Sequence, residues 1–327
     1  MKPSVPSRTL VHAVIAAVTV VGVTAAGAVY MKARAHSDPG LISATAPRSS
    51  PSPTVSVPAQ ASASAGEEES VEPVTEPALD PDELLSRAMD AVSVPSGAKV
   101  AVAVLDLESG QSAAYGRGTF DTASIVKVDI LAALLLQAQD AGRPLTVTEK
   151  AYATKMIENS DNDAATALWR TIGGAAGLDS ANERFGLTDT TGGSGDLWGL
   201  TQTTAADQLT LLRQVFGDES KLSESSRAYL RGLMETIAAG QAWGVSAVAD
   251  GSSWALKNGW LPRSTTGLWD VNSIGRVTVD GGGFLVAVLS KGTATQQRGI
   301  TLVEATARAA VSALTEGSTS ASASVAG

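Results

Sequence analysis

Between residues 80 and 316 the hydrophobic pattern changes period twice, and this change constrains the fold most strongly. An apolar, β-branched run at 99–107 is followed by a turn and a second short run ending near Arg117, which predicts a hairpin. Helical spacing then dominates until about residue 238. Strand spacing returns in three runs, at 253–260, 272–280 and 284–290, before a closing helix at 298–314. Strands at both ends with helices between them predict an α+β fold, with an antiparallel sheet flanked by helices and a separate helical subdomain.

The helices have recognisable starts. Asp80 is a capping residue and Pro81 suits the first helical position, so a helix is expected to begin there. The run 125–139 is apolar nearly all round, which predicts a helix buried on most sides. Further helices are predicted at 147–158, 161–171, 203–216 and 223–238.

Residues 1–35 have the composition of a membrane anchor or a signal peptide. Residues 10–31 contain no Asp, Glu, Lys or Arg, and this run is long enough to cross a bilayer. The length favours an uncleaved anchor, whereas Ala33-Arg34-Ala35 offers a pattern for signal-peptide cleavage. Both alternatives predict an extracytoplasmic domain, either on the cell membrane through a single pass or secreted.

Two segments lack the apolar residues needed for a core. Residues 36–79 are rich in Pro, Ser, Ala and Glu and are predicted to form a disordered linker. Residues 317–327 are rich in Ser and Ala and are predicted to be a disordered tail. The folded domain is therefore expected at 80–316, which is long enough for one core.

Composition excludes several kinds of site. The chain has no cysteine and two histidines, His12 and His36, both outside the predicted domain. A Ser-His-Asp triad, a cysteine nucleophile and a zinc site of the usual ligands are thus excluded there. We expect no metal and no cofactor. The net charge of -9 argues against nucleic acid as a partner.

Two short motifs suggest serine chemistry without histidine. Ser124 precedes Lys127 by three residues, and positions i and i+3 share a helix face, so the amine can reach the hydroxyl. A simpler alternative makes Ser124 a helix cap and Lys127 a solvated charge, although the apolar neighbours of Lys127 argue for burial. Ser160 begins the string Ser-Asp-Asn that ends at Asn162, and its own alternative is to cap the helix starting at Asp161.

A third motif lies on the first strand after the helices. Lys257, Asn258 and Gly259 form a basic–polar–glycine triplet that is followed by Trp260. Taken alone, Asn-Gly is also typical of a hairpin turn.

Together, the three motifs resemble those of the penicillin-recognising serine hydrolases, the class A β-lactamases and D,D-peptidases among them. The resemblance implies that Ser124 is the nucleophile, Lys127 its base and Ser160 a proton relay, all three catalytic. It also implies that Asn162, Lys257, Gly259 and Trp260 bind substrate, with the N–H groups of Ser124 and Trp260 as the oxyanion hole. The implied substrate is a β-lactam or a peptidoglycan peptide ending in D-Ala-D-Ala.

The chain departs from class A β-lactamases in three ways. The loop glutamate that activates the deacylating water is missing, since Glu183 lies in a helical stretch and is best explained as a surface charge. Asn258 replaces a hydroxyl residue expected to contact the substrate carboxylate, and the first two motifs are closer together. We therefore expect a slow enzyme on penicillins. The alternatives are an esterase, amidase or glutaminase, or a non-catalytic or weakly reactive binding protein of the same fold at the cell envelope.

Overall fold

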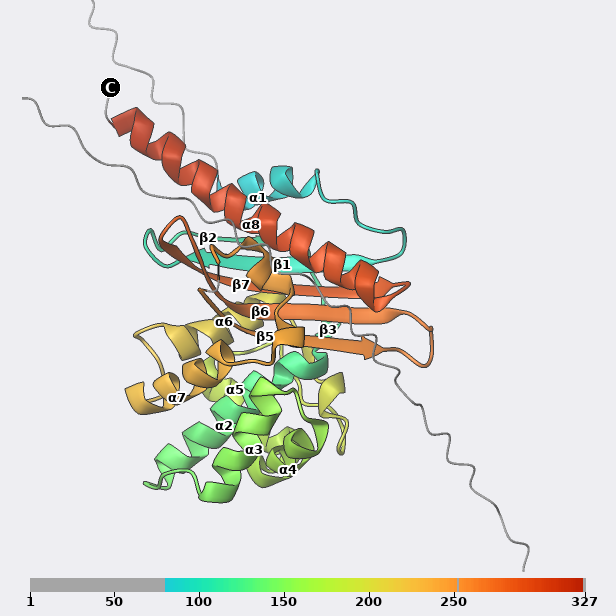
Figure 1. The fold of residues 1–327 in the computed structure, drawn as a ribbon, viewed down its shortest axis with the longest axis vertical. Coiled ribbons are helices and arrows are strands. Elements are labelled where there is room, and N and C mark those ends of the chain that lie inside the picture. Colours follow the sequence, from blue (N-terminus) through green and yellow to red (C-terminus); the bar gives the residue numbers. More distant parts are fainter. Residues whose placement is uncertain (1–79, 252, 326–327) are drawn as a thin grey trace, which may run out of the picture. The chain divides into compact units, whose positions relative to one another are not determined.

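Five antiparallel strands form a sheet in the order β2-β1-β7-β6-β5, which joins the two ends of the domain as the sequence predicts (Figure 1). The computed structural model describes residues 80–251 and 253–325, with side chains up to residue 316. The sheet strands are β1 (Lys99–Asp106), β2 (Ser112–Tyr115), β5 (Trp254–Pro262), β6 (Trp269–Val279) and β7 (Gly282–Thr293). A separate pair consists of β3 (Phe120–Asp121) and β4 (Gln202–Thr203).

Strand β1 shows why both faces of the sheet are covered. Its even-numbered residues, such as Val102, pack with the helices α1 and α8, whereas Ala101 and Ala103 face the other helices. Side chains alternate across a strand, so a strand that is apolar throughout requires helices on both faces. The bounds of the two helices on the first face are α1 (Pro81–Met89) and α8 (Gln296–Val325).

The second face carries the helical part of the molecule (Figure 1). Its helices are α2 (Val126–Asp140), α3 (Val147–Glu158), α4 (Asn162–Ile172), α5 (Gly174–Phe185), α6 (Ala205–Phe216) and α7 (Glu224–Glu235). Helix α2 is buried along most of its length, as the sequence predicts. Short 3₁₀ turns are η1 (Ala123–Ile125), η2 (Trp198–Leu200), η3 (Ala239–Gln241) and η4 (Gly244–Val248).

The last helix is longer than expected. The sequence predicts an ordered end near residue 314 and a disordered tail at 317–327, whereas α8 continues to Val325. Alanine has the highest helix propensity and serine is tolerated, so a helix already anchored by its first half can propagate through such a segment.

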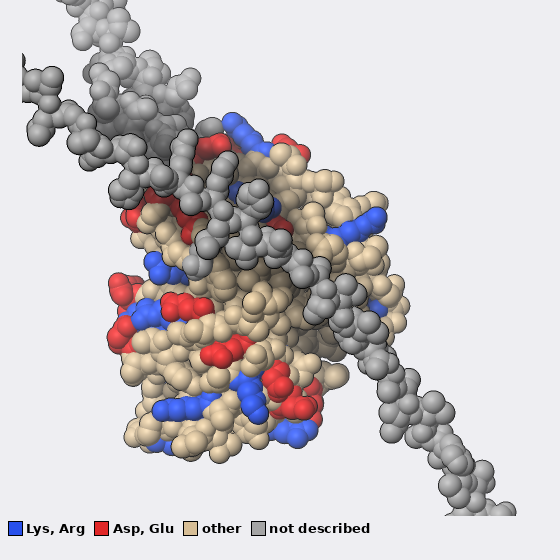
Figure 2. All heavy atoms as spheres, viewed as in Figure 1, with Lys and Arg blue, Asp and Glu red and all other residues tan. Residues whose placement is uncertain are grey.

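Residues 1–79 lie outside the part of the chain that the structure describes, and so do the expected anchor at 10–31 and the linker at 36–79. Within residues 80–251 and 253–325, no helix is long and apolar enough to span a membrane. The face shown in Figure 2 carries acidic and basic side chains interspersed.

Candidate active site

Ser124 lies in η1, the turn that leads from β3 into α2. Ala123 before it has a φ of 48°, a left-handed conformation that costs a residue with a Cβ about 1–2 kcal/mol. Neither η1 nor α2 has a side-chain cap, so the interpretation of Ser124 as a cap is wrong. Ser124 is instead half-buried and lines a cleft of about 320 Å³.

Lys127 is fully buried, so its interpretation as a solvated charge is also wrong. Its Nζ donates to Ser160 O at 2.6 Å, to Ser160 Oγ at 3.1 Å and to Asn162 Oδ1 at 2.8 Å. Burial lowers the pKa of Lys127 to about 7, although the negative charge of Asp161 opposes this shift. Among the hydrogen bonds within residues 80–316, none joins Lys127 to Ser124. The amine is therefore bonded to the second motif.

Ser160 is held in a strained conformation and does not cap α4. Its φ is 55°, while the cap is Asp161, whose Oδ1 accepts from Ala164 N at 2.7 Å. A carboxylate at this position satisfies the first turn of the helix, so the hydroxyl of Ser160 is not needed there. Ser160 Oγ instead accepts from both Lys127 and Lys257.

Lys257 reaches the same hydroxyl from β5, the edge strand of the sheet. Its Nζ lies 3.0 Å from Ser160 Oγ and 3.0 Å from Asn258 O. Burial, and next the charge of Lys127, lower the pKa of Lys257 well below its usual value. Two amines that face one hydroxyl form a short path along which a proton can move.

Gly259 allows β5 to pass directly against the turn that carries Ser124. A Cβ at Gly259 would lie 2.6 Å from Ser124 N and 2.8 Å from Ile125 N, distances that real structures do not tolerate. The next residue, Trp260, lines the same cleft as Ser124 and Asn162. The structure thus brings all seven predicted site residues into one region.

Asn258 stands where the resemblance expects a hydroxyl residue that contacts the substrate carboxylate. Its side chain is 1% exposed and donates to Gln241 O at 2.7 Å and Trp243 O at 2.9 Å. An amide can satisfy these two backbone carbonyls, so Asn258 fastens the segment of η3 and η4 to β5.

Trp198 is a site residue that the motifs did not reveal. Its ring lies 4.9 Å from Lys127 Nζ, its Nε1 donates to Thr166 Oγ1 at 3.1 Å, and it lines the cleft. A tryptophan face over a cation is stabilising. Its only signal in sequence is an aromatic residue in the loop after the second motif. Glu183 lies exposed on α5, as expected for a surface charge.

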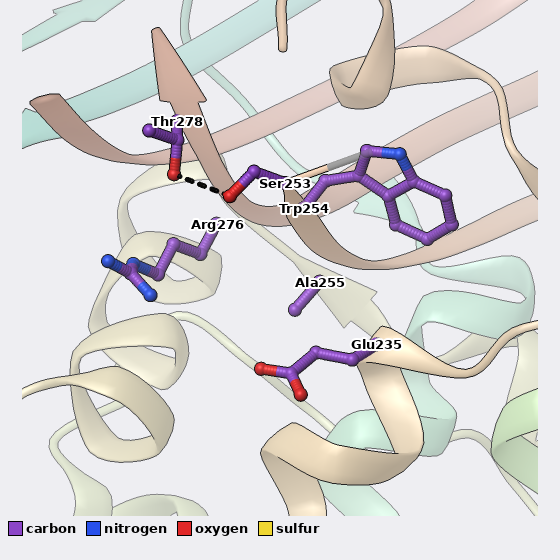
Figure 3. A pocket seen from close by; sticks show the side chains of 6 residues that line it. All are labelled: Glu235, Ser253, Trp254, Ala255, Arg276 and Thr278. Carbon is purple, nitrogen blue, oxygen red and sulfur yellow. Dashed lines mark hydrogen bonds between the residues drawn. The ribbon is translucent and has the colours of Figure 1, made fainter. Parts of the chain in front are cut away.

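Another cavity, of about 260 Å³, lies at the other end of β5 (Figure 3). Glu235 from α7 and Arg276 from β6 line it, together with a hydrogen bond of 3.1 Å between Ser253 and Thr278. Neither hydroxyl is bonded to a lysine there, whereas Ser160 Oγ beside the cleft of Ser124 accepts from two lysines.

Solved structures of similar fold include PBP-A and the TLA-1 extended-spectrum β-lactamase. PBP-A is 23% identical, with a TM-score of 0.61, over 72% of this chain and 96% of PBP-A. The TLA-1 enzyme is 18% identical, with a TM-score of 0.62, over 72% of this chain and 98% of the enzyme. At these identities the likeness shows the α+β fold of the β-lactamase and transpeptidase type.

Sequence comparison gives relatives of part of the chain. The lipoprotein LppW of Mycobacterium tuberculosis is 31% identical over 144 residues, which are 42% of this chain and 46% of LppW. The chain thus spans about half the length of this curated relative. The family model Beta-lactamase2, described as the beta-lactamase enzyme family, matches residues 140–314, more than half of the chain. With its fold and this match, the chain belongs to the beta-lactamase enzyme family.

Proposed function

We propose that the chain is an acyl-serine hydrolase that acts on β-lactams or on amides of the D-Ala-D-Ala type, with Ser124 as nucleophile. The observation that carries this proposal is the meeting of Lys127 and Lys257 at Ser160 Oγ, at 3.1 and 3.0 Å, beside the cleft that Ser124 lines. Few other functions require two buried lysines on one hydroxyl.

The first step forms an ester and breaks an amide. Ser124 Oγ bonds to the substrate carbonyl carbon while its proton passes to the neutral amine of Lys127. The C–N bond then breaks, and the leaving nitrogen receives a proton through Ser160. The N–H groups of Ser124 and Trp260 would stabilise the oxyanion by about 3–4 kcal/mol each. The packing of Gly259 against Ser124 supports this pairing.

Substrate binding uses the remaining candidates. Asn162 already bonds to Lys127 and lines the cleft, so its amide can orient both the base and the amide side chain of a substrate. Lys257 supplies positive charge for a substrate carboxylate. Trp198 covers Lys127 on the loop side. Deacylation is expected to be slow, because the sequence lacks the loop glutamate that activates the deacylating water in class A β-lactamases.

The decisive experiment is labelling of the full-length protein with a fluorescent penicillin. We expect an adduct on Ser124, identified by intact mass and peptide mapping, and no adduct with Ser124→Ala. Circular dichroism should show the same fold for both proteins. If the folded parent protein stays unmodified after long exposure, the proposal is wrong.

A second candidate is a non-catalytic binding protein of the same fold. The observation that favours it is the set of three hydrogen bonds that Lys127 makes to Ser160 and Asn162. An ammonium has three donors, so this arrangement fits the protonated form, which cannot accept the proton of Ser124. Reversible penicillin binding without an adduct would support this candidate, whereas an adduct would exclude it.

We also propose that the protein acts at the cell envelope. The apolar run at 10–31 supports an anchor or a signal peptide, and the relative LppW is named a lipoprotein. Fractionation should find the protein in the membrane if the anchor is retained. A soluble extracytoplasmic form that begins after Ala35 would instead indicate signal cleavage, and a cytoplasmic protein would contradict both.

A further inference from the structure

A cavity of about 430 Å³ adjoins the cleft of Ser124 and has a different character. Its polar lining comes from β1, β3, β4, β6, β7 and the turn between β5 and β6. The charged and amide side chains in it are Lys99, Asp121, Gln202, Arg263, Asp270 and Lys291. The cavity is larger than the cleft itself and contains three basic groups.

Three separate segments run from the cleft into this cavity within two residues. In each segment, a residue that lines the cleft is two positions away from a residue that lines the cavity. The pairs, with the cleft residue first, are Ala123 and Asp121, Leu200 and Gln202, and Leu261 and Arg263. Two residues of extended chain span about 7 Å. The cleft and the cavity are therefore close neighbours, at a separation that a flexible acyl chain can span.

The direction of β5 tells which end of the substrate would enter. Under the proposed function, Lys257 meets the carboxylate on the leaving-group side. The strand then passes Trp260 and reaches Arg263, so the cavity lies beyond the opposite end of the cleft. The group that enters it belongs to the acyl portion of the substrate.

Two lysines in the cavity stand directly opposite each other across neighbouring strands. Lys99 of β1 and Lys291 of β7 are register partners, so their side chains share one face of the sheet. Like charges in this arrangement are destabilising, and an anion between them would relieve the repulsion. Lys291 is held in place, since its Nζ donates to Thr119 O at 2.6 Å and lies 4.7 Å from the ring of Phe120.

The acidic groups of the cavity are partly neutralised. Arg263 forms an ion pair with Asp121, which also accepts a hydrogen bond from Gln202. Burial, and next a hydrogen bond with Asp121, raise the pKa of Asp270 to about 6. The two lysines therefore outweigh the single remaining carboxylate.

We propose that this cavity is a subsite for a carboxylate on the acyl portion of the substrate, bound between Lys99 and Lys291. The inference rests on the proposed function and names the class of substrate: acyl donors that carry an additional negative charge remote from the scissile amide.

The test compares two penicillins that differ by one charge. In the carboxylate probe, the amine of 6-aminopenicillanic acid is acylated by one end of adipic acid, and the carboxylate at the other end stays free. In the monoamide probe, that second carboxylate is replaced by an uncharged amide. With the full-length protein, we expect the carboxylate probe to acylate Ser124 about tenfold faster at low salt, and salt should reduce the ratio. In the double variant Lys99→Met, Lys291→Met the ratio should fall to about one.

Matched variants separate charge from structure. Lys99→Arg should keep the preference, and Lys221→Met, an exposed lysine on another surface, should leave it unchanged. The rate at which the monoamide probe acylates Ser124 in the double variant should equal that of the parent protein, which shows that the site around Ser124 is intact. Equal rates for the two probes on the parent protein would overturn the subsite while leaving the proposed function intact.

Calorimetry with the Ser124→Ala variant tests the subsite without any reaction. The carboxylate probe should bind about tenfold more tightly than the monoamide, and the preference should disappear in the lysine double variant. Absence of an adduct on the parent protein would contradict the proposed function. Equal binding of both probes would contradict the subsite, so the two failures are distinguishable.

Discussion

The protonation of Lys127 should set the pH dependence of the reaction. Burial lowers the pKa of this amine to about 7, so it is mostly neutral, and able to accept a proton, above that pH. We expect the rate of adduct formation on Ser124 to rise with pH, with a midpoint near pH 7. Rates measured between about pH 5 and 9 would check this. A rate that is flat or falls across this range would show that Lys127 is not the base.

Trp198 should help to keep that pKa low. In Trp198→Ala water reaches Lys127, the desolvation that dominates the shift weakens, and the midpoint should move to higher pH. Loss of the cation–π contact acts in the opposite direction but is worth only about 0.5–2 kcal/mol. Trp198→Phe retains a ring face and should keep a midpoint close to that of the parent. The same pH–rate measurement would contradict this role if Trp198→Ala leaves the midpoint unchanged.

Much of the candidate site was predictable because its motifs are short and local. Ser124 and Lys127 lie on one turn, and Lys257 and Gly259 lie on one strand. The direction of Asn258 was not predictable, since its partners Gln241 and Trp243 come from a segment with no regular pattern. The approach of Trp198 likewise depends on how a loop folds back over α2.

At the scale of elements, the contact between β5 and η1 can be tested through Gly259. In Gly259→Ala the new methyl group would collide with the backbone of Ser124 and Ile125, so the strand must move. We expect acylation to slow by at least about 100-fold, since misplacement by about 1 Å is that costly. The free energy of unfolding should fall by about 1–3 kcal/mol.

Gly232 provides the matched control. It lies in α7 with nothing within 4 Å of the position of an added Cβ. Gly232→Ala should leave acylation unchanged and stabilise the protein by up to about 1 kcal/mol. Denaturant unfolding and adduct formation measure both variants. Equal effects at the two positions would show that close packing at Gly259 is not the cause.

Helix α5 is predicted only in part, since the sequence indicates a helical stretch around Glu183 but not the start of the helix at Gly174. Its first turns contain Gly174 and Gly177, which in sequence resemble helix breakers. Gly177 is present for packing, since a Cβ there would lie 1.7 Å from Ile172 O. Burial of Leu178 and Phe185 stabilises the helix despite these glycines. Tertiary contacts of this kind are not visible in local periodicity.

At the scale of the whole molecule, Asp129 should make stability depend on pH. This carboxyl on α2 is buried, and burial raises its pKa to about 8. The folded state therefore holds a proton that the unfolded chain releases near pH 4. Stability should fall as pH rises from about 4 to 8, by up to about 1.4 kcal/mol per pH unit. Urea unfolding of Asp129→Asn should show a flatter dependence between these limits, and an equal slope would refute this role.

The order of the sheet has a consequence for folding. Strand β1 pairs with β7, so Val102 lies opposite Val288 only after the whole intervening helical part has been enclosed. Pairing between such distant segments is slow, because the entropy of closing the loop is lost before contacts compensate it. Lys257 reaches Ser160 from the same sheet. A chain that is still folding should thus remain unreactive, and the onset of penicillin labelling would time the completion of folding.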